Sequence, residues 1–127
     1  MSNRIPALLA RSRTELDASR VLASAGFSDQ AISRAYYGAF YAAEAALMSL
    51  GETRSKHSGV VAAFGRLVVR DGGFDEKLGG ELRRLFELRN AADYSWLDTP
   101  EQGGDEPLDA AQRFVEGVER WIDQRSP

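Results

Sequence analysis

The sequence has no cysteine and only one histidine, His57, among its 127 residues. Disulfides and thiolate metal ligands are therefore excluded, and a lone imidazole does not make a zinc site. A phosphate-binding loop is also missing, because the glycine pairs at 72–73 and 103–104 are not followed by Lys and Ser or Thr. The sequence thus predicts no metal and no cofactor.

Long hydrophobic runs are missing as well. The apolar stretch at residues 7–10 is far too short for a signal peptide or a membrane span, so we expect a cytoplasmic protein without membrane attachment. The net charge of −3 offers no global attraction to nucleic acid, so any such binding would depend on a local basic face.

No segment alternates like a β-strand, whereas five segments have the period of an amphipathic helix. These predicted helices cover about residues 5–25, 28–51, 55–71, 74–94 and 108–123, and a polar Gly/Pro-rich loop covers 97–107. The predicted fold is an all-α, up-and-down helical bundle of four long helices plus a C-terminal helix. Residues 1–127 suit a single domain of this kind, since 43% of them are hydrophobic.

The second predicted helix has few residues of the exposed type, which predicts a central helix covered on several sides. One of its rows is almost entirely small and would let another backbone approach closely. Its small residues are Ala35, Gly38, Ala42, Ala45 and Ser49. This helix is also a candidate subunit interface.

The fourth predicted helix places an arginine on its apolar stripe, where a leucine would be expected. Arg89 lies four residues beyond Leu85 and seven beyond Leu82, and Asp93 follows four residues later. A charge on a core-facing stripe is unfavourable unless it is paired. Arg89 and Asp93 are therefore either a structural ion pair or the edge of a site, for which phosphate is a suitable ligand.

The second helix also carries an aromatic cluster. Tyr36 and Phe40 are expected in the core, whereas Tyr37 and Tyr41 are candidates for lining a cleft or an interface, since aromatic faces can stack bases. His57 begins the third helix and is expected to be a capping or core-edge residue rather than a general base, because no partner is evident.

Three motifs together resemble the HEPN-domain family, in that family's order. They are SRAYYGAFYAA at 33–43, TRSKHSG at 53–59 and LRNAADY at 88–94. The resemblance covers about residues 5–122 and is closest to small stand-alone prokaryotic members with an Arg-Asn-x-x-Asp-Tyr motif. It implies a helical bundle that commonly forms a homodimer.

In the family's ribonuclease members, an Arg, a following polar residue and a His form a composite site across the dimer. Arg89 and Asn90 match the first two positions, but Tyr94 stands where the His would be. Some of those members are toxins whose nucleotidyltransferase antitoxin adenylylates a tyrosine two positions after the His, where this chain has Trp96. The resemblance therefore leaves cleavage and its usual control without their key residues.

Two functions remain open. The first is a non-nuclease or weakly active module that dimerises and binds a nucleotide, RNA or a nucleotidyltransferase partner, in a toxin–antitoxin or defence system. Arg89, Asp93, Tyr94, Tyr37, Tyr41 and His57 would line its ligand site or interface. The second is a metal-independent ribonuclease in which Arg89 and Asn90 act with Tyr94 or His57 as a substitute base. An unperturbed tyrosine, with a pKa near ~10, is a poor base at neutral pH, which favours the first function.

Overall fold

The computed structural model describes residues 4–93 and 105–125. In chain order, the described residues form α1 (Arg4–Ser24), α2 (Ser28–Ser49), α3 (His57–Ala63), the π-helix η1 (Phe64–Arg70), α4 (Glu76–Asp93) and α5 (Asp105–Arg125). They contain no strand. The all-α prediction is therefore confirmed.

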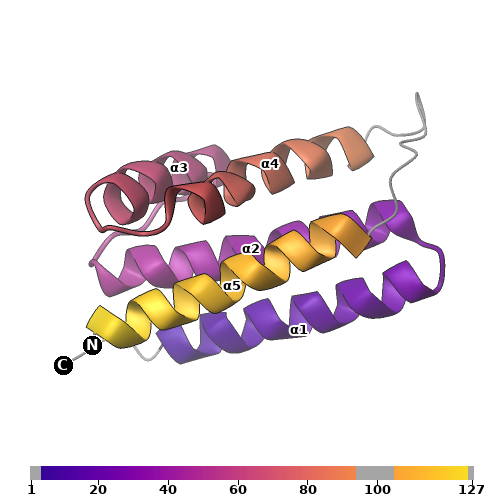
Figure 1. Ribbon diagram of the computed structural model, residues 1–127, viewed down its shortest axis with the longest axis horizontal. Coiled ribbons are helices and arrows are strands. Elements are labelled where there is room, and N and C mark those ends of the chain that lie inside the picture. The colour runs from indigo at the N-terminus through magenta and orange to yellow at the C-terminus, as the bar shows by residue number, and fades with distance from the viewer. Residues whose placement is uncertain (1–3, 94–104, 126–127) are drawn as a thin grey trace.

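The helices pack in two layers (Figure 1). The antiparallel hairpin of α1 and α2 and the long helix α5 form the lower layer in this view, and α3, η1 and α4 form the upper one. The start of α1 and the end of α5 lie at the same end of the bundle. This is the up-and-down arrangement that the sequence predicts.

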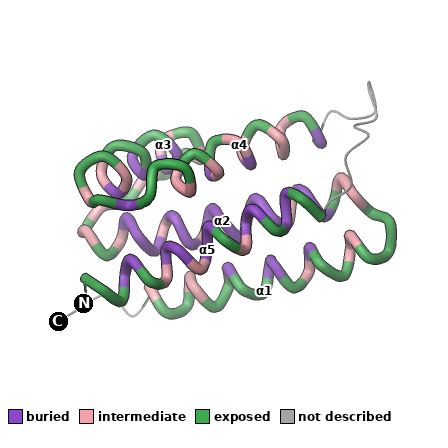
Figure 2. The backbone as a smooth tube through the Cα atoms, in the orientation of Figure 1, coloured by how far each residue is buried: buried purple, intermediate pink, exposed green. Residues whose placement is uncertain are grey.

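Helix α2 is the central element, as expected from its composition. It contacts α1, α3, η1, α4 and α5, and it carries buried residues along its whole length, whereas α1 and α4 bury only one side (Figure 2). A helix whose side chains are small and apolar on most faces can pack against several neighbours at once. The core therefore forms around α2.

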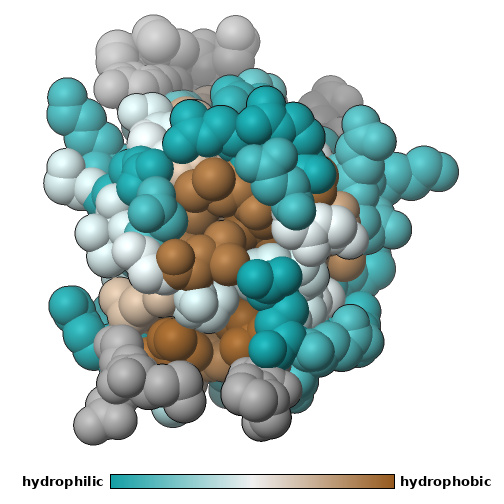
Figure 3. Space-filling model, turned by 90° about the vertical axis from the view of Figure 1, so that its left-hand side faces the viewer, coloured by the Kyte–Doolittle hydropathy of each residue, from teal (hydrophilic) through white to brown (hydrophobic). Residues whose placement is uncertain are grey.

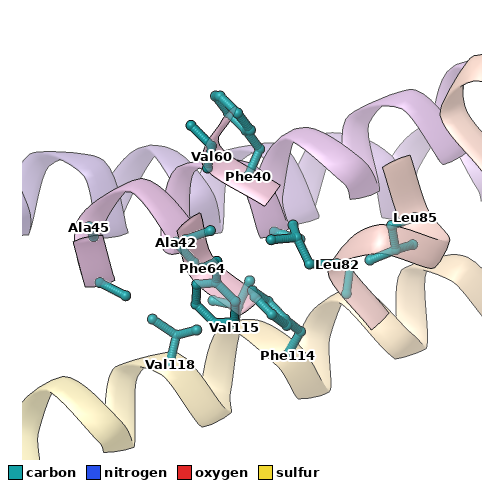
Figure 4. Close-up of a cluster of buried hydrophobic side chains, with 14 of the residues drawn as sticks. Phe40, Ala42, Ala45, Val60, Phe64, Leu82, Leu85, Phe114, Val115 and Val118 are labelled. Carbon is teal, nitrogen blue, oxygen red and sulfur yellow. The ribbon is translucent and has the colours of Figure 1, made fainter. Parts of the chain in front are cut away.

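Buried side chains from α2, α3, η1, α4 and α5 meet in one cluster (Figure 4). Phe64 of η1 and Phe114 of α5 are in ring contact at 5.2 Å, and Leu82 of α4 is 1% exposed. Because each of these elements contributes a buried face to the same cluster, the position of α4 relative to α2 is fixed by apolar packing.

The small row of α2 allows α1 to approach closely. A Cβ added to Gly38 would lie 2.8 Å from Leu16 Cδ2 and 3.2 Å from the Ser12 carbonyl oxygen. The Ser12 and Ser19 hydroxyls of α1 are buried and donate to the carbonyls of Gly38 and Ala31, at 2.6 and 2.7 Å. The predicted close approach therefore occurs inside the chain, between α1 and α2.

The third predicted helix continues to Arg70, but it changes from α-helical to π-helical at Phe64. The wider π turn is followed by a turn at Gly72, whose carbonyl accepts a 2.8 Å hydrogen bond from Trp121 Nε1 of α5. A side chain at Gly72 would collide with the Val68 carbonyl at 2.6 Å. Periodicity predicts a helix here without indicating the change of winding.

Two helix starts differ from the prediction. Helix α4 begins at Glu76 rather than at residue 74, because Asp75 Oδ1 accepts from the Leu78 amide and so caps the first turn. Helix α5 begins at Asp105 rather than at residue 108, since Pro107 is compatible with a first helical turn. The part of the predicted loop at 97–104 and the end of the fourth predicted helix at residue 94 lie outside the described residues.

The end of the bundle where α1 begins and α5 ends has apolar side chains at its centre, surrounded by polar ones (Figure 3). Elsewhere two large apolar residues are well exposed, Val21 at 69% and Phe27 at 54%, near the turn between α1 and α2. Within the described ranges, none of the helices combines the length and the hydropathy needed to cross a membrane.

Candidate functional site

Four aromatic side chains on two successive turns of α2 form the centre of the site. Tyr36 is fully buried, and its ring contacts Tyr37 at 5.3 Å and Phe40 at 5.8 Å between centroids. Tyr37 and Tyr41 are half-buried, with their centroids 6.1 Å apart. Helical spacing thus places one pair toward the core and the other along the surface.

Arg89 of α4 lies against this cluster. Its Nη2 donates a 3.1 Å hydrogen bond to the Tyr37 hydroxyl, and its guanidinium carbon lies 5.7 and 5.5 Å from the ring centroids of Tyr36 and Tyr37. The side chain is 22% exposed. The arginine is therefore held at the rim of the core by π-faces and by a hydroxyl acceptor from α2.

Arg89 also has polar neighbours on its own helix. Its Nε lies 3.1 Å from Asp93 Oδ2, and its Nη1 lies 3.4 Å from the amide oxygen of Asn90. The Asp93 contact is an ion pair without hydrogen-bond geometry, so the buried Nε donates to no acceptor in the structure. The predicted structural pair is thus present, but it does not occupy all donors of the guanidinium.

His57, at the start of α3, completes the cluster. Its ring stacks on Phe40 at 4.2 Å and meets the edge of Tyr37 at 5.6 Å, and its Nδ1 lies 3.1 Å from the Tyr36 hydroxyl. The predicted core-edge position is therefore correct. Sequence reasoning found no partner for this histidine, and the structure identifies Tyr36 as that partner.

Burial and Arg89 together set the protonation states of this pair. Burial lowers the pKa of His57 below 6.5, and the positive charge of Arg89 lowers it further. Burial raises the pKa of Tyr36 well above 10, although Arg89 acts in the opposite direction. At neutral pH both rings are therefore uncharged, and the pair is joined by a neutral hydrogen bond.

The direction of this hydrogen bond depends on the histidine tautomer. A Tyr36 hydroxyl that donates to Nδ1 leaves the ring proton on Nε2. An Nδ1–H that donates to the Tyr36 oxygen instead leaves Nε2 free to accept a proton. Only the second tautomer gives His57 a basic nitrogen that is not already engaged.

The structure brings most of the predicted site residues into one region between α2, the start of α3 and the second half of α4 (Figure 1). The predicted residues that gather there are Tyr37, Tyr41, His57, Arg89, Asn90 and Asp93. Tyr94, the remaining candidate, lies outside the described residues, as does Trp96.

Sequence reasoning missed an ion pair beside the cluster. Glu15 of α1 is 5% exposed, and its Oε2 accepts a 2.8 Å hydrogen bond from Arg34 Nη1. The guanidinium of Arg34 lies 4.7 Å from the centroid of Tyr37. Glu15 follows Ser12 by three residues and precedes Ser19 by four, so a charge on the buried row of the first helix was the available signal.

The surface of the cluster combines guanidiniums with tyrosine rings. Arg11 of α1 lies 5.3 Å from the centroid of Tyr41, so each of the two half-buried tyrosines has at least one arginine against its ring. Guanidiniums form paired hydrogen bonds with phosphate, and aromatic rings can stack bases. The described residues contain no cluster of three or more side chains suited to bind a metal ion.

An all-α bundle with a tyrosine-rich second helix against an Arg-Asn motif in the fourth defines a HEPN-type domain. The HEPN domain family matches residues 5–121. The chain therefore belongs to the HEPN domain family, which confirms the resemblance of its three motifs.

Named relatives extend over most of the chain. A "UPF0332 protein" of Thermotoga maritima is 35% identical over 114 residues, which cover 89% of this chain and 86% of that protein. A protein of Methanocaldococcus jannaschii named "Putative toxin MJ0605" is 29% identical over 118 residues, covering 93% of this chain and 88% of the relative. A second protein of that organism, "Putative toxin MJ0142", is 32% identical over 87 residues, or 68% of this chain and 59% of its own length.

Proposed function

We propose that this protein is a weakly active or inactive HEPN module that binds a phosphate-bearing ligand, a nucleotide or RNA, on the face formed by α2 and α4. The names of two relatives support a place in a toxin–antitoxin or defence system. The observation that carries the proposal is the guanidinium of Arg89, which is fixed against Tyr37. Tyr37 and Asn90 each accept from one of its two Nη atoms, and each Nη atom has a second N–H that can donate to an anion.

The polar groups around Arg89 suit anion binding better than cleavage. Arg89 stabilises negative charge, and Asn90 adds an amide beside it. RNA cleavage also needs a group that removes a proton at neutral pH. Tyr94 at the usual histidine position is a poor base unless its pKa is strongly lowered.

The test measures binding and cleavage on the same preparations. Wild type, Arg89→Gln and Arg13→Gln are titrated into a labelled single-stranded RNA oligonucleotide by fluorescence anisotropy and with ATP by calorimetry. Arg13→Gln is the matched control, because Arg13 pairs with Glu119 between α1 and α5. We expect Arg89→Gln alone to weaken binding at least about tenfold. Equal binding by all three proteins contradicts the proposal.

A second candidate function is a metal-independent ribonuclease, and the position of His57 favours it. The imidazole is uncharged at neutral pH and borders the same tyrosine ring as Arg89. In the tautomer that donates from Nδ1 to Tyr36, Nε2 would be the base that Tyr94 does not supply.

Cleavage of RNA by highly purified protein in EDTA decides between these functions. A ribonuclease of this kind loses activity with either Arg89→Gln or His57→Gln. Its rate also falls on the acidic side of the pH profile, below pH 6.5, where His57 becomes protonated. If wild type cleaves no faster than Arg89→Gln, the ribonuclease function is excluded and the binding module remains.

Two partners belong to the proposal as well. A homodimer through the surface that carries Tyr37 and Tyr41 would bring two copies of Arg89 near each other, and sedimentation of Tyr41→Glu against wild type tests it. A nucleotidyltransferase-family protein is the proposed heterologous partner, for which co-purification from cells expressing both genes is the direct assay.

A further inference from the structure

We infer that Arg34 is a second anion-binding arginine of the site, positioned by the buried carboxylate of Glu15, and that the pair Arg34 and Arg89 receives a ligand with two neighbouring phosphates. This inference rests on the proposed function and adds to it a residue and a ligand class.

Glu15 of α1 is buried although it is an acidic residue. Of the buried polar or charged residues in the described part of the chain, two are the serines that bond α1 to α2, and Glu15 is the third and the one that carries a charge. A carboxylate buried between two helices destabilises the fold unless a cation or hydrogen-bond donors pair with it. Its hydrogen-bond partner is Arg34.

Pairing with Glu15 orients the side chain of Arg34. The carboxylate engages Nη1 from the buried side, while the arginine side chain is 36% exposed. A guanidinium has five N–H donors, so the donors on its open side stay available. The buried carboxylate therefore fixes the orientation of the arginine and leaves it open toward solvent.

Arg34 and Arg89 both contact Tyr37. Arg34 lies at the ring of Tyr37, 4.7 Å from its centroid, while Arg89 reaches the hydroxyl of the same residue at 3.1 Å. Two cations from different helices thus flank one side chain, and each has one carboxylate partner. Both guanidinium carbons lie within 5.5 Å of the centroid of Tyr37, so an anion that contacts both arginines is attracted by two positive charges.

Arg84, another arginine of α4, differs from Arg34 and Arg89 in its acidic partners. Arg84 forms ion pairs with both Glu81 and Glu106, so two carboxylates occupy its donors and it joins α4 to α5. Arg34 and Arg89 have half as many acidic partners and lie on aromatic rings. Their surroundings are those of ligand-binding arginines, in contrast to the structural arginine at position 84.

The spacing of the two guanidiniums indicates the ligand. Both guanidinium carbons lie near the ring of Tyr37, 4.7 and 5.5 Å from its centroid, and each arginine is paired with its own carboxylate. Each guanidinium can therefore bind a phosphate of its own. This arrangement suits adjacent phosphates better than a single one. Such phosphates occur in a polynucleotide backbone and in a nucleoside diphosphate, and the half-buried ring of Tyr41 lies next along α2 for a base to stack on.

The experiment compares orthophosphate with pyrophosphate by calorimetry for wild type, Arg34→Gln, Arg89→Gln and Arg13→Gln. We expect wild type and Arg13→Gln to prefer pyrophosphate, and Arg34→Gln to lose about ten- to a hundredfold in pyrophosphate affinity while orthophosphate binding changes little. Unchanged pyrophosphate affinity in Arg34→Gln overturns the inference.

The outcomes separate this inference from the proposed function. If wild type binds neither anion and no RNA, the proposed function fails. If Arg89→Gln loses binding while Arg34→Gln retains it, the proposed function stands and the inference fails.

Arg34→Gln also leaves Glu15 buried without a cation, which lowers stability on its own. The double variant Glu15→Gln/Arg34→Gln replaces the ion pair by two neutral amides and controls for this effect. We expect it to recover thermal stability without recovering pyrophosphate affinity. Recovery of both would show that Arg34 acts only through the fold and would overturn the inference.

A parallel titration with a single-stranded RNA oligonucleotide and with ADP identifies the source of the phosphates. For the single-stranded oligonucleotide, loss of one phosphate contact reduces the slope of log affinity against log salt by about 0.7. We expect that reduction in Arg34→Gln and not in Arg13→Gln if the ligand is a polynucleotide. Weakened ADP binding with an unchanged RNA slope assigns the pair to a nucleotide.

Discussion

A single histidine makes the electrostatics of the aromatic cluster directly measurable, residue by residue. His57 contacts aromatic rings of α2 and forms a hydrogen bond with the buried Tyr36. The positive charge of Arg89 on α4 lowers its pKa. The pKa of His57 therefore depends on how α2, α3 and α4 pack against one another. In NMR, its imidazole gives one titrating resonance without overlap from another histidine.

The titration of that resonance has an expected direction. We expect the pKa of His57 to lie below 6.5 in the wild type and to move upward in Arg89→Gln, because the substitution removes a neighbouring positive charge. NMR of the imidazole protons between pH 4 and 8 measures both values. A wild-type pKa at or above 6.5 would contradict the buried position.

The same shift links stability to pH. Unfolded His57 binds a proton more tightly than folded His57, so unfolding takes up a proton once the pH falls below 6.5. The contribution is fully present above pH 6.5 and is lost as the pH falls through 6.5 toward the folded pKa. Urea unfolding of wild type and His57→Gln between pH 5 and 8 should show this dependence only in the wild type.

Removal of the Tyr37 hydroxyl tests how Arg89 is held. Tyr37→Phe deletes the acceptor of the 3.1 Å hydrogen bond from Arg89 but keeps the ring. We expect a loss of about 1–2 kcal/mol in the free energy of unfolding and weaker anion binding. Tyr41→Phe is the control, because its hydroxyl makes no hydrogen bond in the described structure. Equal effects in both variants would show that Arg89 does not depend on Tyr37.

Most of the candidate residues were recognisable in the sequence because each broke a pattern. Arg89 interrupts an apolar stripe, and His57 and the two half-buried tyrosines lie on helix faces next to core positions. The partnership of Arg34 with Glu15 was not recognisable, because it joins residues of different helices and depends on how α1 and α2 are rotated against each other. Periodicity assigns a residue to a face and says little about which residue it meets.

The contact between α1 and α2 is one of those that depend on a glycine. Gly38→Ala would place its Cβ 2.8 Å from Leu16 Cδ2, so we expect a loss of about 1–3 kcal/mol in the free energy of unfolding. The matched control is Gly80→Ala in α4, where the added Cβ meets nothing within 4 Å. That variant should gain about 1 kcal/mol from helix propensity. Thermal and urea unfolding check both signs, and a stabilising Gly38→Ala would contradict the close packing.

The elements themselves were largely predictable, and each exception has its own physical cause. A Cβ added at Gly79 would lie 2.5 Å from Val69 Cγ2 of η1, so this glycine marks close packing between α4 and η1. The π turn at Phe64 has the same apolar stripe as an α-helix and so left no separate trace in the sequence. Helix starts depend on one capping side chain and shift easily by a few residues.

At the scale of the molecule, the two layers differ in how much they bury. Buried side chains run along all of α2, whereas α4 contributes three buried residues, Leu82, Leu85 and Ala92. A helix with fewer buried apolar contacts opens locally at a lower cost in free energy. We expect amides of α2 to exchange hydrogen only through global unfolding and those of α4 to exchange through a smaller opening.

Hydrogen-exchange mass spectrometry at several denaturant concentrations measures this difference. Exchange from α2 and α4 with the same free energy of opening would show that the bundle unfolds as one unit. Added pyrophosphate should slow exchange in α4 more than in α5, because the proposed ligand contacts Arg89.

The division of labour between α2 and α4 affects how such a protein can change over generations. A substitution on α2 disturbs the core and the proposed ligand face together. Most such variants therefore fold poorly and are selected against. Helix α4 buries only Leu82, Leu85 and Ala92, and Arg89 and Asp93 lie outside this buried set. Single substitutions outside the buried residues of α4 can therefore change the ligand preference while the helical bundle still folds.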